Sequence, residues 1–493
     1  MKNVAPISGL PEPLAAAIRR SLGDGGAVYV VGGYVRDRLL GRPTLDIDIT
    51  VGAEPAIVAK RLASTLDAHV FPLSQEHGAW RVTPRAASDR FAYLDITRIR
   101  GSIDDDLHQR DFTMNAIAIA PEGGSPIDPF GGIEDIGDRR LRLVSDSAVA
   151  ADPLRALRAV RFATELEFTL DDASAAIIAA DADQIRRTSG ERQRDEIARI
   201  FDTPHAADGI RLLDRLNLLD QILPELIPAK GCVQPAEHHY WDVFNHSVET
   251  VAVLDCLLGN QRDDAACRSR RAILWRDWPV EFAERAYWDA EMIEGRTRRT
   301  LLKLTGLLHD VSKPETRTVQ EDGRVRFFGH SERGSDVAGA ILRRLKFSHR
   351  ETKAAELLVR EHLRPGQLAA VGQQPTPRAL YRLFRDLGGL TPELLVLFLA
   401  DGAAAAGPRQ SPEQWAAHVA YTGWILRQRV ERETLVKPQR LVTGHDLIAE
   451  LGMAPGPALG RVLDELTEAE AAGEITTRDQ ALHYARSLLA GGS

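Results

Sequence analysis

The sequence predicts an α+β fold in which a sheet-containing amino-terminal head is followed by a mostly helical remainder. Short runs with the alternating apolar pattern of strands lie at 28–31, 45–51, 69–73, 79–82 and 91–97. Helical periodicity marks 34–40 and 53–67, and helical patterns dominate beyond residue 150. A chain of 493 residues is long enough for about three or four domains.

Composition places the chain among soluble globular proteins. Apolar residues make up 44 % and charged residues 27 %, and no apolar run reaches the roughly 18 residues that a membrane span needs. The first twenty residues lack a signal-peptide pattern, and Cys232, Cys256 and Cys267 have no C-x-x-C spacing. We therefore expect a cytoplasmic protein with free thiols. The net charge of −8 does not indicate nucleic-acid binding, although a local basic face could still provide it.

Residues 28–51 carry the most informative pattern. The apolar run 28–31 ends at Gly32 and Gly33, where a backbone without Cβ atoms can approach a ligand closely. Residues 34–40 predict a short helix that stops at Gly41. The strict alternation of 45–51 then predicts a strand with Asp46 and Asp48 on one face.

Two carboxylates on one strand face repel each other unless a cation lies between them. Mg²⁺ takes oxygen ligands and usually keeps substrate phosphates among them, and a glycine turn one helix away offers backbone N–H groups to phosphate. The pattern therefore favours phosphoryl or nucleotidyl transfer with two metal ions at Asp46 and Asp48. The alternative for an isolated D-x-D is an exposed edge strand with two solvated carboxylates.

The stretch GGYVRDRLLGRPTLDIDIT closely resembles the signature of class II tRNA nucleotidyltransferases (CCA-adding enzymes) and bacterial poly(A) polymerases. That signature is GG-x-VRD-x-LLG followed by D-x-D, and every element of it is present. The resemblance implies a polymerase-β-like nucleotidyltransferase head in which Asp46 and Asp48 are catalytic and bind Mg²⁺. Gly32, Gly33 and Arg36 would then hold the nucleotide triphosphate.

The stretch RDFTMNA resembles the family motif RRDFT-x-NA, with Gln109 in place of the first arginine. We expect Arg110, Asp111 and Asn115 to lie on one side of a helix, near its start, and to bind nucleotide. Arg110 could clamp a triphosphate with its forked donors. A capped helix with a solvated acidic lead-in is the alternative.

Asp152, Arg155 and Arg158 recur every three residues in a predicted helix with Pro153 in its first turn. The stretch aligns with the family's E-D-x-x-R base template, with Ala151 in place of the glutamate. Asp152 would accept from an amino group of the base and Arg155 would donate to a ring nitrogen or carbonyl, which selects C or A against U or G. A surface ion pair of little energetic consequence is the alternative.

Asp95 lies on the predicted strand 91–97, and only seven residues separate it from Ile103. We prefer a structural role for Asp95, in an ion pair with a nearby arginine, to a place beside Asp46 and Asp48. Many CCA-adding enzymes carry a longer flexible loop at this point, and relatives that add only CC have a shortened one. The resemblance therefore leans toward a CC-adding enzyme.

A second set of metal-type ligands begins near residue 228. The ordered set H…HD…H…H…D, with Leu-Leu-His-Asp-Val-Ser-Lys-Pro around its central pair, resembles the HD phosphohydrolase superfamily. The implied ligands of a divalent metal are His246, His309, Asp310, His330, His362 and Asp401. A degenerate HD fold retained for RNA docking is the alternative.

These patterns divide the chain into a head (1–145), a helical neck with the base-selecting helix (146–227), an HD domain (228–405) and a helical RNA-binding tail (406–493), with 402–412 as the clearest linker. Residues 257–300 interrupt the HD pattern without a functional explanation. We expect an enzyme that adds C, or C and A, to tRNA from CTP and ATP. A poly(A) polymerase, an A-adding enzyme, an HD hydrolase with a non-catalytic head and an RNA-binding scaffold are the rivals.

Overall fold

A computed structural model of the chain describes residues 6–23, 26–74, 78–86, 88–89, 91–258, 264–369, 374–438 and 440–490. The chain forms two compact units. Unit 1 comprises residues 1–189 and 212–222, and unit 2 comprises residues 190–211 and 223–493. Helix α10 (Ala206–Arg215) spans the division.

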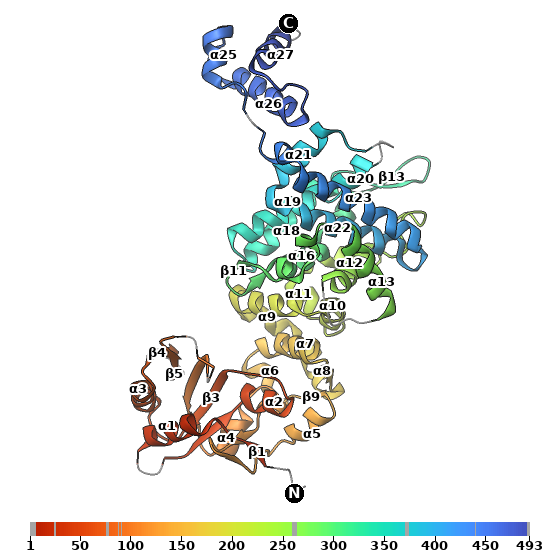
Figure 1. The fold of residues 1–493 in the computed structure, drawn as a ribbon. Helices are drawn as coiled ribbons and strands as arrows, with labels where there is room; N and C mark the ends of the chain where they lie inside the picture. The colour runs from red at the N-terminus through yellow and green to blue at the C-terminus, as the bar shows by residue number, and fades with distance from the viewer. Residues whose placement is uncertain are drawn as a thin grey trace. The chain divides into compact units, whose positions relative to one another are not determined.

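Unit 1 contains the predicted mixture of strands and helices (Figure 1). Its elements in chain order are β1 (Ile7–Ser8), α1 (Glu12–Leu22), β2 (Val28–Val31), α2 (Gly33–Leu39), β3 (Asp46–Val51), α3 (Pro55–Leu66), β4 (Ala68–Ser74), β5 (Ala79–Pro84), β6 (Tyr93–Arg98), α4 (Ile103–His108), η1 (Thr113–Asn115), β7 (Ala118–Ile119), β8 (Gly123–Gly124), α5 (Gly132–Gly137), β9 (Arg140–Leu141), α6 (Ala148–Ala151), α7 (Leu154–Leu166), β10 (Thr169–Leu170), α8 (Asp172–Ala180), η2 (Ala182–Arg187) and α11 (Leu218–Ile222).

A six-stranded sheet with the order β4-β5-β6-β3-β2-β7 forms the centre of unit 1. Only β3 and β6 run parallel within it, whereas the other pairs are antiparallel. The alternation predicted for β3 is confirmed, because Ile47 and Ile49 are buried while Asp46 is exposed on the other face and Asp48 is half-buried. The apolar face thereby fixes the register that presents both carboxylates.

Unit 2 is largely helical, so the predicted fold class is confirmed (Figure 1). Its remaining elements are α9 (Gly190–Asp202), η3 (Pro224–Ala229), α12 (Val243–Leu258), α13 (Ala265–Asp277), α14 (Val280–Ala283), α15 (Arg285–Asp289), β11 (Glu291–Ile293), β12 (Arg296–Thr297), α16 (Arg298–Leu308), α17 (Lys313–Thr316), β13 (Arg317–Val319), β14 (Val325–Phe327), α18 (His330–Arg344), α19 (His349–Glu361), α20 (Arg364–Ala369), α21 (Pro377–Leu387), η4 (Gly388–Leu390), α22 (Thr391–Ala406), η5 (Gly407–Arg409), α23 (Pro412–Glu431), α24 (Glu433–Val436), α25 (Gly444–Leu451), α26 (Pro457–Ala472) and α27 (Arg478–Ala490).

One apolar core joins most helices of unit 2, and α12, α16 and α22 pack against one another within it. The described part of the stretch 257–300, residues 257–258 and 264–300, contributes to this core, since Trp278 and Trp288 are both buried in it. The Nε1–H of Trp278 donates to Thr422 Oγ1 on α23 at 3.1 Å. The stretch therefore has a packing role. The helical stretch Pro377–Arg409 contains an 18-residue segment that is apolar enough to cross a membrane. Because 61 % of that segment is buried inside the protein, it is typical of core helices.

The linker predicted at 402–412 is wrong in its first half. Helix α22 continues to Ala406, and Ala403 and Ala404 are buried. The alanine run favours helix strongly enough to override the flanking glycines. The turn at Gly407–Arg409 then leads directly into α23.

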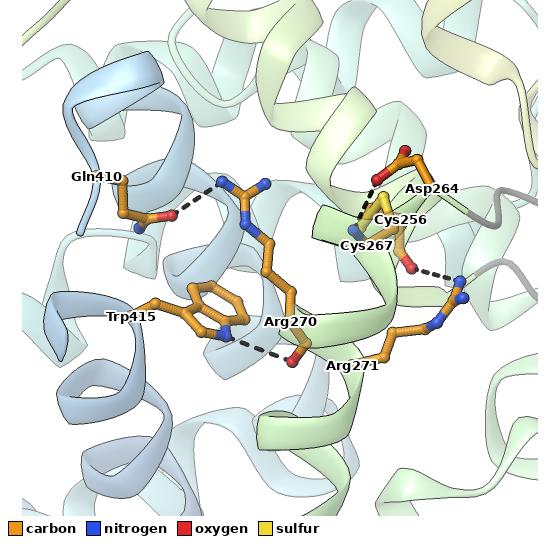
Figure 2. Close-up of a disulfide and its surroundings, with 7 residues drawn as sticks. All are labelled: Cys256, Asp264, Cys267, Arg270, Arg271, Gln410 and Trp415. Carbon is orange, nitrogen blue, oxygen red and sulfur yellow. Dashed lines mark hydrogen bonds between the residues drawn. A yellow bond between two sulfur atoms is a disulfide. The ribbon is translucent and has the colours of Figure 1, made fainter. Parts of the chain in front are cut away.

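The expectation of three free thiols is corrected by a disulfide between Cys256 and Cys267, whose Cα atoms lie 5.2 Å apart. Figure 2 shows it joining the end of α12 to the first turn of α13. Nearby, Arg271 Nη1 donates to the carbonyl of Cys256 at 3.2 Å, and Trp415 Nε1 donates to the carbonyl of Arg270 at 3.3 Å. Cys232 remains a free cysteine. Sequence spacing could not predict the pairing, because it depends on how the two helices pack.

Candidate active site and metal centre

The carboxylates of the head lie on two adjacent strands. Strands β3 and β6 pair with Asp48 directly opposite Asp95, and Asp46 opposite Tyr93. Burial raises the pKa of Asp48, and the like charges of Asp95 and Asp46 add to the rise, while Arg110 opposes it. Such a concentration of negative charge is what a divalent cation would neutralise, so the residues present fit Mg²⁺.

Gly32 brings the glycine turn against this cluster. It precedes α2 with φ of 70°, and a Cβ placed on it would lie 2.9 Å from Arg110 Nη1 and 3.0 Å from Asp48 Oδ2. Only glycine fits this position without displacing one of those groups. Arg110 also has a buried Nε with no hydrogen-bond partner in the described part of the chain. The turn, the carboxylate and a donor for an anion therefore converge at one point.

The helix expected to carry Arg110, Asp111 and Asn115 is shorter than predicted. Helix α4 ends at His108, and the three residues follow in a turn that closes with the short 3-10 helix η1. A capping box between Ser102 and Asp105 starts α4. The helix ends at His108, and the backbone is extended at Phe112, directly before η1. The helical period expected for residues 110–115 is therefore absent.

Four of the predicted nucleotide-binding residues instead contact one another. Arg36 Nη1 donates to Asn115 Oδ1 at 2.9 Å, and Asn115 Nδ2 donates to Asp111 Oδ1 at 2.9 Å. Arg158 closes the chain with two hydrogen bonds from Nε and Nη2 to Asp111 Oδ2, at 2.9 and 2.6 Å. Arg36 also makes a two-point contact with the Asp37 carboxylate. The network joins α2, η1 and α7 underneath the site.

The Asp111 carboxylate is the centre of that network. Burial alone would raise its pKa, but the Arg158 guanidinium and the Asn115 amide outweigh burial and lower it to about 2. Asp111 is therefore ionised at neutral pH, as a carboxylate with charge-assisted partners should be.

Asp152 and Arg155 flank the junction between α6 and α7. Asp152 ends α6, and its Oδ1 accepts from the Leu154 N–H at 3.2 Å. Arg155 Nη2 donates to the carbonyl of Gln109 at 2.5 Å and Nη1 donates to the carbonyl of Ala148 at 3.2 Å. The helix predicted to carry Asp152, Arg155 and Arg158 therefore begins after Asp152, whose backbone is extended, and only Arg155 and Arg158 lie in α7. Arg155 is tied to the backbone that precedes Arg110.

Asp95 has the arginine partner expected for a structural carboxylate, but it also lies directly opposite Asp48, which is the placement that we did not favour from the sequence. Arg81 Nε and Nη2 donate to the two oxygens of Asp95 at 2.7 Å each, and the Arg81 guanidinium lies 3.9 Å from the centre of the Tyr93 ring. Tyr93 in turn shares a hydrogen bond with Asp46, which contributes with burial to a raised pKa of its hydroxyl. Sequence reasoning missed Arg81 and Tyr93, although their alternation with Asp95 on strands β5 and β6 could have indicated them.

In unit 2, the six residues predicted as HD metal ligands meet in one buried cluster. Two groups could each hold a metal ion: His246, His309 and Asp310, and Asp310, His330 and His362. His246 Nε2 lies 3.4 Å from Asp310 Oδ2 and 3.0 Å from Asp401 Oδ1. On the other side, His330 Nε2 lies 3.4 Å and His362 Nε2 3.7 Å from Asp310 Oδ1. Asp310 therefore stands between two histidine pairs, with one oxygen toward each.

Backbone carbonyls orient three of the imidazoles. The Nδ1 atoms of His309, His330 and His362 lie 2.8, 2.7 and 2.6 Å from the carbonyls of Gly306, Phe327 and Val359. These contacts direct the Nε2 atoms of the three rings at the cluster. A mixed set of imidazole and carboxylate donors fits a divalent transition metal.

Two residues beside this cluster were not predicted. Lys313 Nζ lies 2.7 Å from Asp310 Oδ2 and donates to Gln234 Oε1 at 2.8 Å. The ring of His239 stacks edge-on against His246, with ring centres 5.2 Å apart. The position of Lys313 three residues after Asp310 could have indicated its place, whereas His239 comes from a loop that sequence periodicity cannot position.

Profiles of known families cover most of the chain. A poly(A) polymerase head domain matches residues 28–142, and an RNA and SrmB binding site of polymerase A matches 167–230. An HD domain matches residues 279–406, and a tRNA nucleotidyltransferase domain matches 425–485. His246 lies outside the matched HD segment, yet the fold brings it to the cluster.

Several curated relatives align over nearly the full length. An A-adding tRNA nucleotidyltransferase of Deinococcus radiodurans is 37 % identical over 92 % of this chain and 93 % of the relative. CC-adding tRNA nucleotidyltransferases of Thermus thermophilus and Geobacter sulfurreducens are each 32 % identical, over 92 % and 97 % of this chain and 92 % and 96 % of the relatives. The chain belongs to the tRNA nucleotidyltransferase family. It is an enzyme of the nucleotidyltransferase type, as its motifs predicted.

Solved structures of this family share the fold. A CCA-adding enzyme in an apo form matches with a TM-score of 0.63 at 18 % identity, over 97 % of this chain and 93 % of that one. The CCA-adding enzyme of Bacillus stearothermophilus in complex with CTP matches with a TM-score of 0.60 at 23 % identity, over 97 % and 98 %. The family's fold, an α/β head followed by helices and an HD domain, is therefore confirmed for this chain.

Proposed function

We propose that the head transfers a nucleotide from CTP or ATP to the 3′ end of tRNA and releases pyrophosphate. The observation that carries the proposal is the convergence of Asp48, Arg110 and the Gly32 turn, with Asp46 on the same strand face. Relatives that span the chain are named for adding C or A to tRNA, and one solved neighbour is a Thermotoga maritima CCA-adding enzyme in complex with tRNA. The HD domain and tail would serve the same cytoplasmic enzyme, with residues 406–493 binding RNA.

Each part of this site has a distinct task. Two bound Mg²⁺ ions would activate the RNA 3′-hydroxyl and stabilise charge on the leaving pyrophosphate, and Asp46 and Asp48 would hold them. Arg110, whose Nε is buried and unpartnered, would donate to the triphosphate. Gly32 and Gly33 let the triphosphate approach the backbone. Arg36, Asp111, Asn115 and Arg158 would position these groups and bind nucleotide from beneath.

Asp152 and Arg155 would select the base. Asp152 would accept a hydrogen bond from the amino group of cytosine or adenine, and Arg155 would donate to the adjacent ring nitrogen. Uracil and guanine present a carbonyl and a ring N–H at these positions, so they reverse the pattern of donors and acceptors. Replacing Arg155 with alanine should therefore relax discrimination against UTP and GTP more than it changes the rate with CTP. Competition between labelled CTP and UTP on one tRNA measures this ratio, and an unchanged ratio would contradict the assignment.

We propose C addition as the main reaction. The connection between β6 and α4 comprises only residues 99–102 and is closed by the capping box of Ser102 and Asp105. Such a tight turn has no room for the flexible loop associated with a switch from C to A. The second candidate is A addition, which is favoured by the 37 % identity to the Deinococcus enzyme.

Three tRNA transcripts separate these reactions. They end at the discriminator base, in C and in CC, and each receives labelled CTP or ATP with Mg²⁺. Addition that stops at CC supports our proposal, whereas completion to CCA removes the significance of the short turn. Addition of A to the CC transcript alone identifies an A-adding enzyme, and long A tails identify a poly(A) polymerase.

A second activity, hydrolysis of phosphate esters, is favoured by the HD cluster. Two possible ligand groups share Asp310, an arrangement that suits two metal ions bridged by one carboxylate. Lys313 supplies a cation for a phosphoryl oxygen next to that carboxylate. Protein loaded with Ni²⁺ or Mn²⁺ should hydrolyse p-nitrophenyl phosphate or its bis ester, and His309→Ala should remove both the metal and the hydrolysis.

A further inference from the structure

The loop of residues 231–242 lies against the HD cluster and is anchored on both sides. At its ends, the Gly231 N–H donates to Asp242 Oδ2 at 2.9 Å and the Val243 N–H donates to the carbonyl of Cys232 at 3.0 Å. Within it, Gln234 contacts Lys313, and the Tyr240 N–H donates to the carbonyl of Ala405 at 2.9 Å. The loop therefore holds a fixed position beside the cluster.

His239 is a residue of this loop that contacts one of the possible ligands, His246, without belonging to either ligand group. Neither possible ligand group among the described residues includes it, although its ring stacks edge-on against that of His246. Its Nδ1 is buried and has no hydrogen-bond partner in the part of the chain that the structure describes. Buried polar atoms in proteins normally have partners, so this one indicates that a ligand completes the site.

The surroundings of His239 favour an anionic ligand with several oxygens. A neutral imidazole has one N–H donor and one acceptor nitrogen, so it can donate to an oxygen of such a ligand. Lys313, the other neighbour that the sequence did not predict, contributes a positive charge beside the carboxylate of Asp310.

We propose that His239 binds the phosphoryl group of the HD centre's substrate by donating its ring N–H to a non-bridging phosphoryl oxygen. This role rests on the proposed hydrolase function of the cluster. In this role His239 orients the phosphoryl group through a hydrogen bond. The alternative is that His239 only packs against His246 and holds the loop in place.

Three substitutions of His239 separate binding from packing in the full-length protein. His239→Phe keeps an aromatic ring against His246 but removes the nitrogens, His239→Gln keeps an N–H donor, and His239→Ala removes both. His238→Ala is the matched control, because the neighbouring His238 side chain is 68 % exposed. Metal content and nucleotide addition to tRNA are measured on every variant to confirm that both centres remain folded.

The readouts are hydrolysis of p-nitrophenyl phosphate by metal-loaded protein and binding of inorganic phosphate measured by calorimetry. We expect His239→Phe and His239→Ala to weaken phosphate binding and kcat/KM by about tenfold or more at unchanged metal content, as for a lost hydrogen bond to a charged group. His239→Gln should recover part of the loss, and His238→Ala should behave as the wild type.

Two outcomes overturn the proposal. Wild-type kinetics and phosphate affinity in His239→Phe would show that the ring only packs. A wild-type protein that holds metal but binds no phosphate would also overturn it, together with the hydrolase function. If the wild type binds phosphate through His239 but hydrolyses neither ester, the hydrolase function fails while the anion-binding role of His239 stands.

Discussion

At the scale of single residues, Asp48 is a half-buried carboxylate beside two others, and a bound cation would neutralise their charge. Its position on β3 follows from strand alternation, and its raised pKa follows from burial beside Asp95 and Asp46. Ionising it in the metal-free protein opposes folding. Its stabilising contribution is therefore present below the ordinary aspartate pKa and is lost as pH rises through the raised value. A divalent cation would reverse that cost at neutral pH.

We predict that Asp48→Asn lowers the rate of nucleotide addition by at least about a thousandfold without destabilising the metal-free head. The amide has the shape of the carboxylate but carries no charge. The melting temperature of the metal-free Asp48→Asn protein at pH 7 should therefore equal or exceed that of the wild type. Mg²⁺ should raise the melting temperature of the wild type more than that of the variant. Scanning calorimetry with and without Mg²⁺ checks this, and an equal Mg²⁺ shift in both proteins would contradict a metal site at Asp48.

The pKa of Asp111 is shifted in the opposite direction to that of Asp48. Its pKa is lowered to about 2, so it stabilises the fold above the ordinary aspartate value, and this contribution is lost as pH falls toward 2. We predict that Asp111→Asn destabilises the head by about 2 kcal/mol at pH 7, because Arg158 loses its charged partner. The difference should shrink near pH 3. Urea unfolding at the two pH values measures it, and a difference that stays constant would show that the ion pair contributes nothing.

At the scale of elements, the turn between β2 and α2 brings backbone and carboxylate together. Two glycines in this region have nearly the same positive φ but different surroundings. Gly32 has φ of 70° and faces Asp48 and Arg110, whereas Gly41 has φ of 68° and no atom within 4 Å of its virtual Cβ. The pair separates backbone strain from crowding of the site.

We predict that Gly32→Ala and Gly41→Ala each destabilise the head by about 1 to 2 kcal/mol, because both positions have a positive φ that residues with a Cβ atom rarely adopt. Only Gly32→Ala should also impair catalysis, since its methyl group would displace Arg110 or Asp48. Thermal unfolding and the KM for CTP measure the two effects. Equal kinetic damage in both variants would mean that strain alone, rather than the Arg110 and Asp48 contacts, explains the glycine.

Elements were predictable from sequence where one period persisted. The alternation of β3 and the helical patterns of α2 and α3 predicted those elements to within one or two residues. The helix through Arg110 and Asn115 failed because local capping and turn chemistry ended it at His108. The disulfide of Cys256 and Cys267 and the approach of His239 to His246 depend on tertiary packing, which leaves no periodic signal.

At the scale of the whole molecule, the chain carries two candidate centres whose possible ligands differ. The head offers carboxylates suited to Mg²⁺, and the helical unit offers imidazoles with Asp310 and Asp401. Their residues lie in separate compact units, with Asp46 and Asp48 in unit 1 and the HD ligands in unit 2. Motifs predicted both sets, because each motif keeps its own spacing.

We predict that the two centres can be inactivated independently. Asp46→Ala should abolish nucleotide addition and leave phosphate ester hydrolysis unchanged, while the double substitution of His309 and Asp310 with alanine should do the reverse. Both activities are measured on the same preparations, with circular dichroism as the control for folding. Loss of both activities in a folded Asp46→Ala protein would show that the centres are coupled.

The most direct test of the central proposal is incorporation of labelled CTP and ATP into tRNA lacking its CCA end and into tRNA ending in CC. Purified wild-type protein is compared with Asp46→Asn and Asp48→Asn in the presence of Mg²⁺. We expect the wild type to add C to the first tRNA with release of one pyrophosphate per nucleotide, and neither variant to add any nucleotide. Wild-type protein that extends neither tRNA, or variants that extend them at the wild-type rate, would contradict nucleotidyl transfer at Asp46 and Asp48.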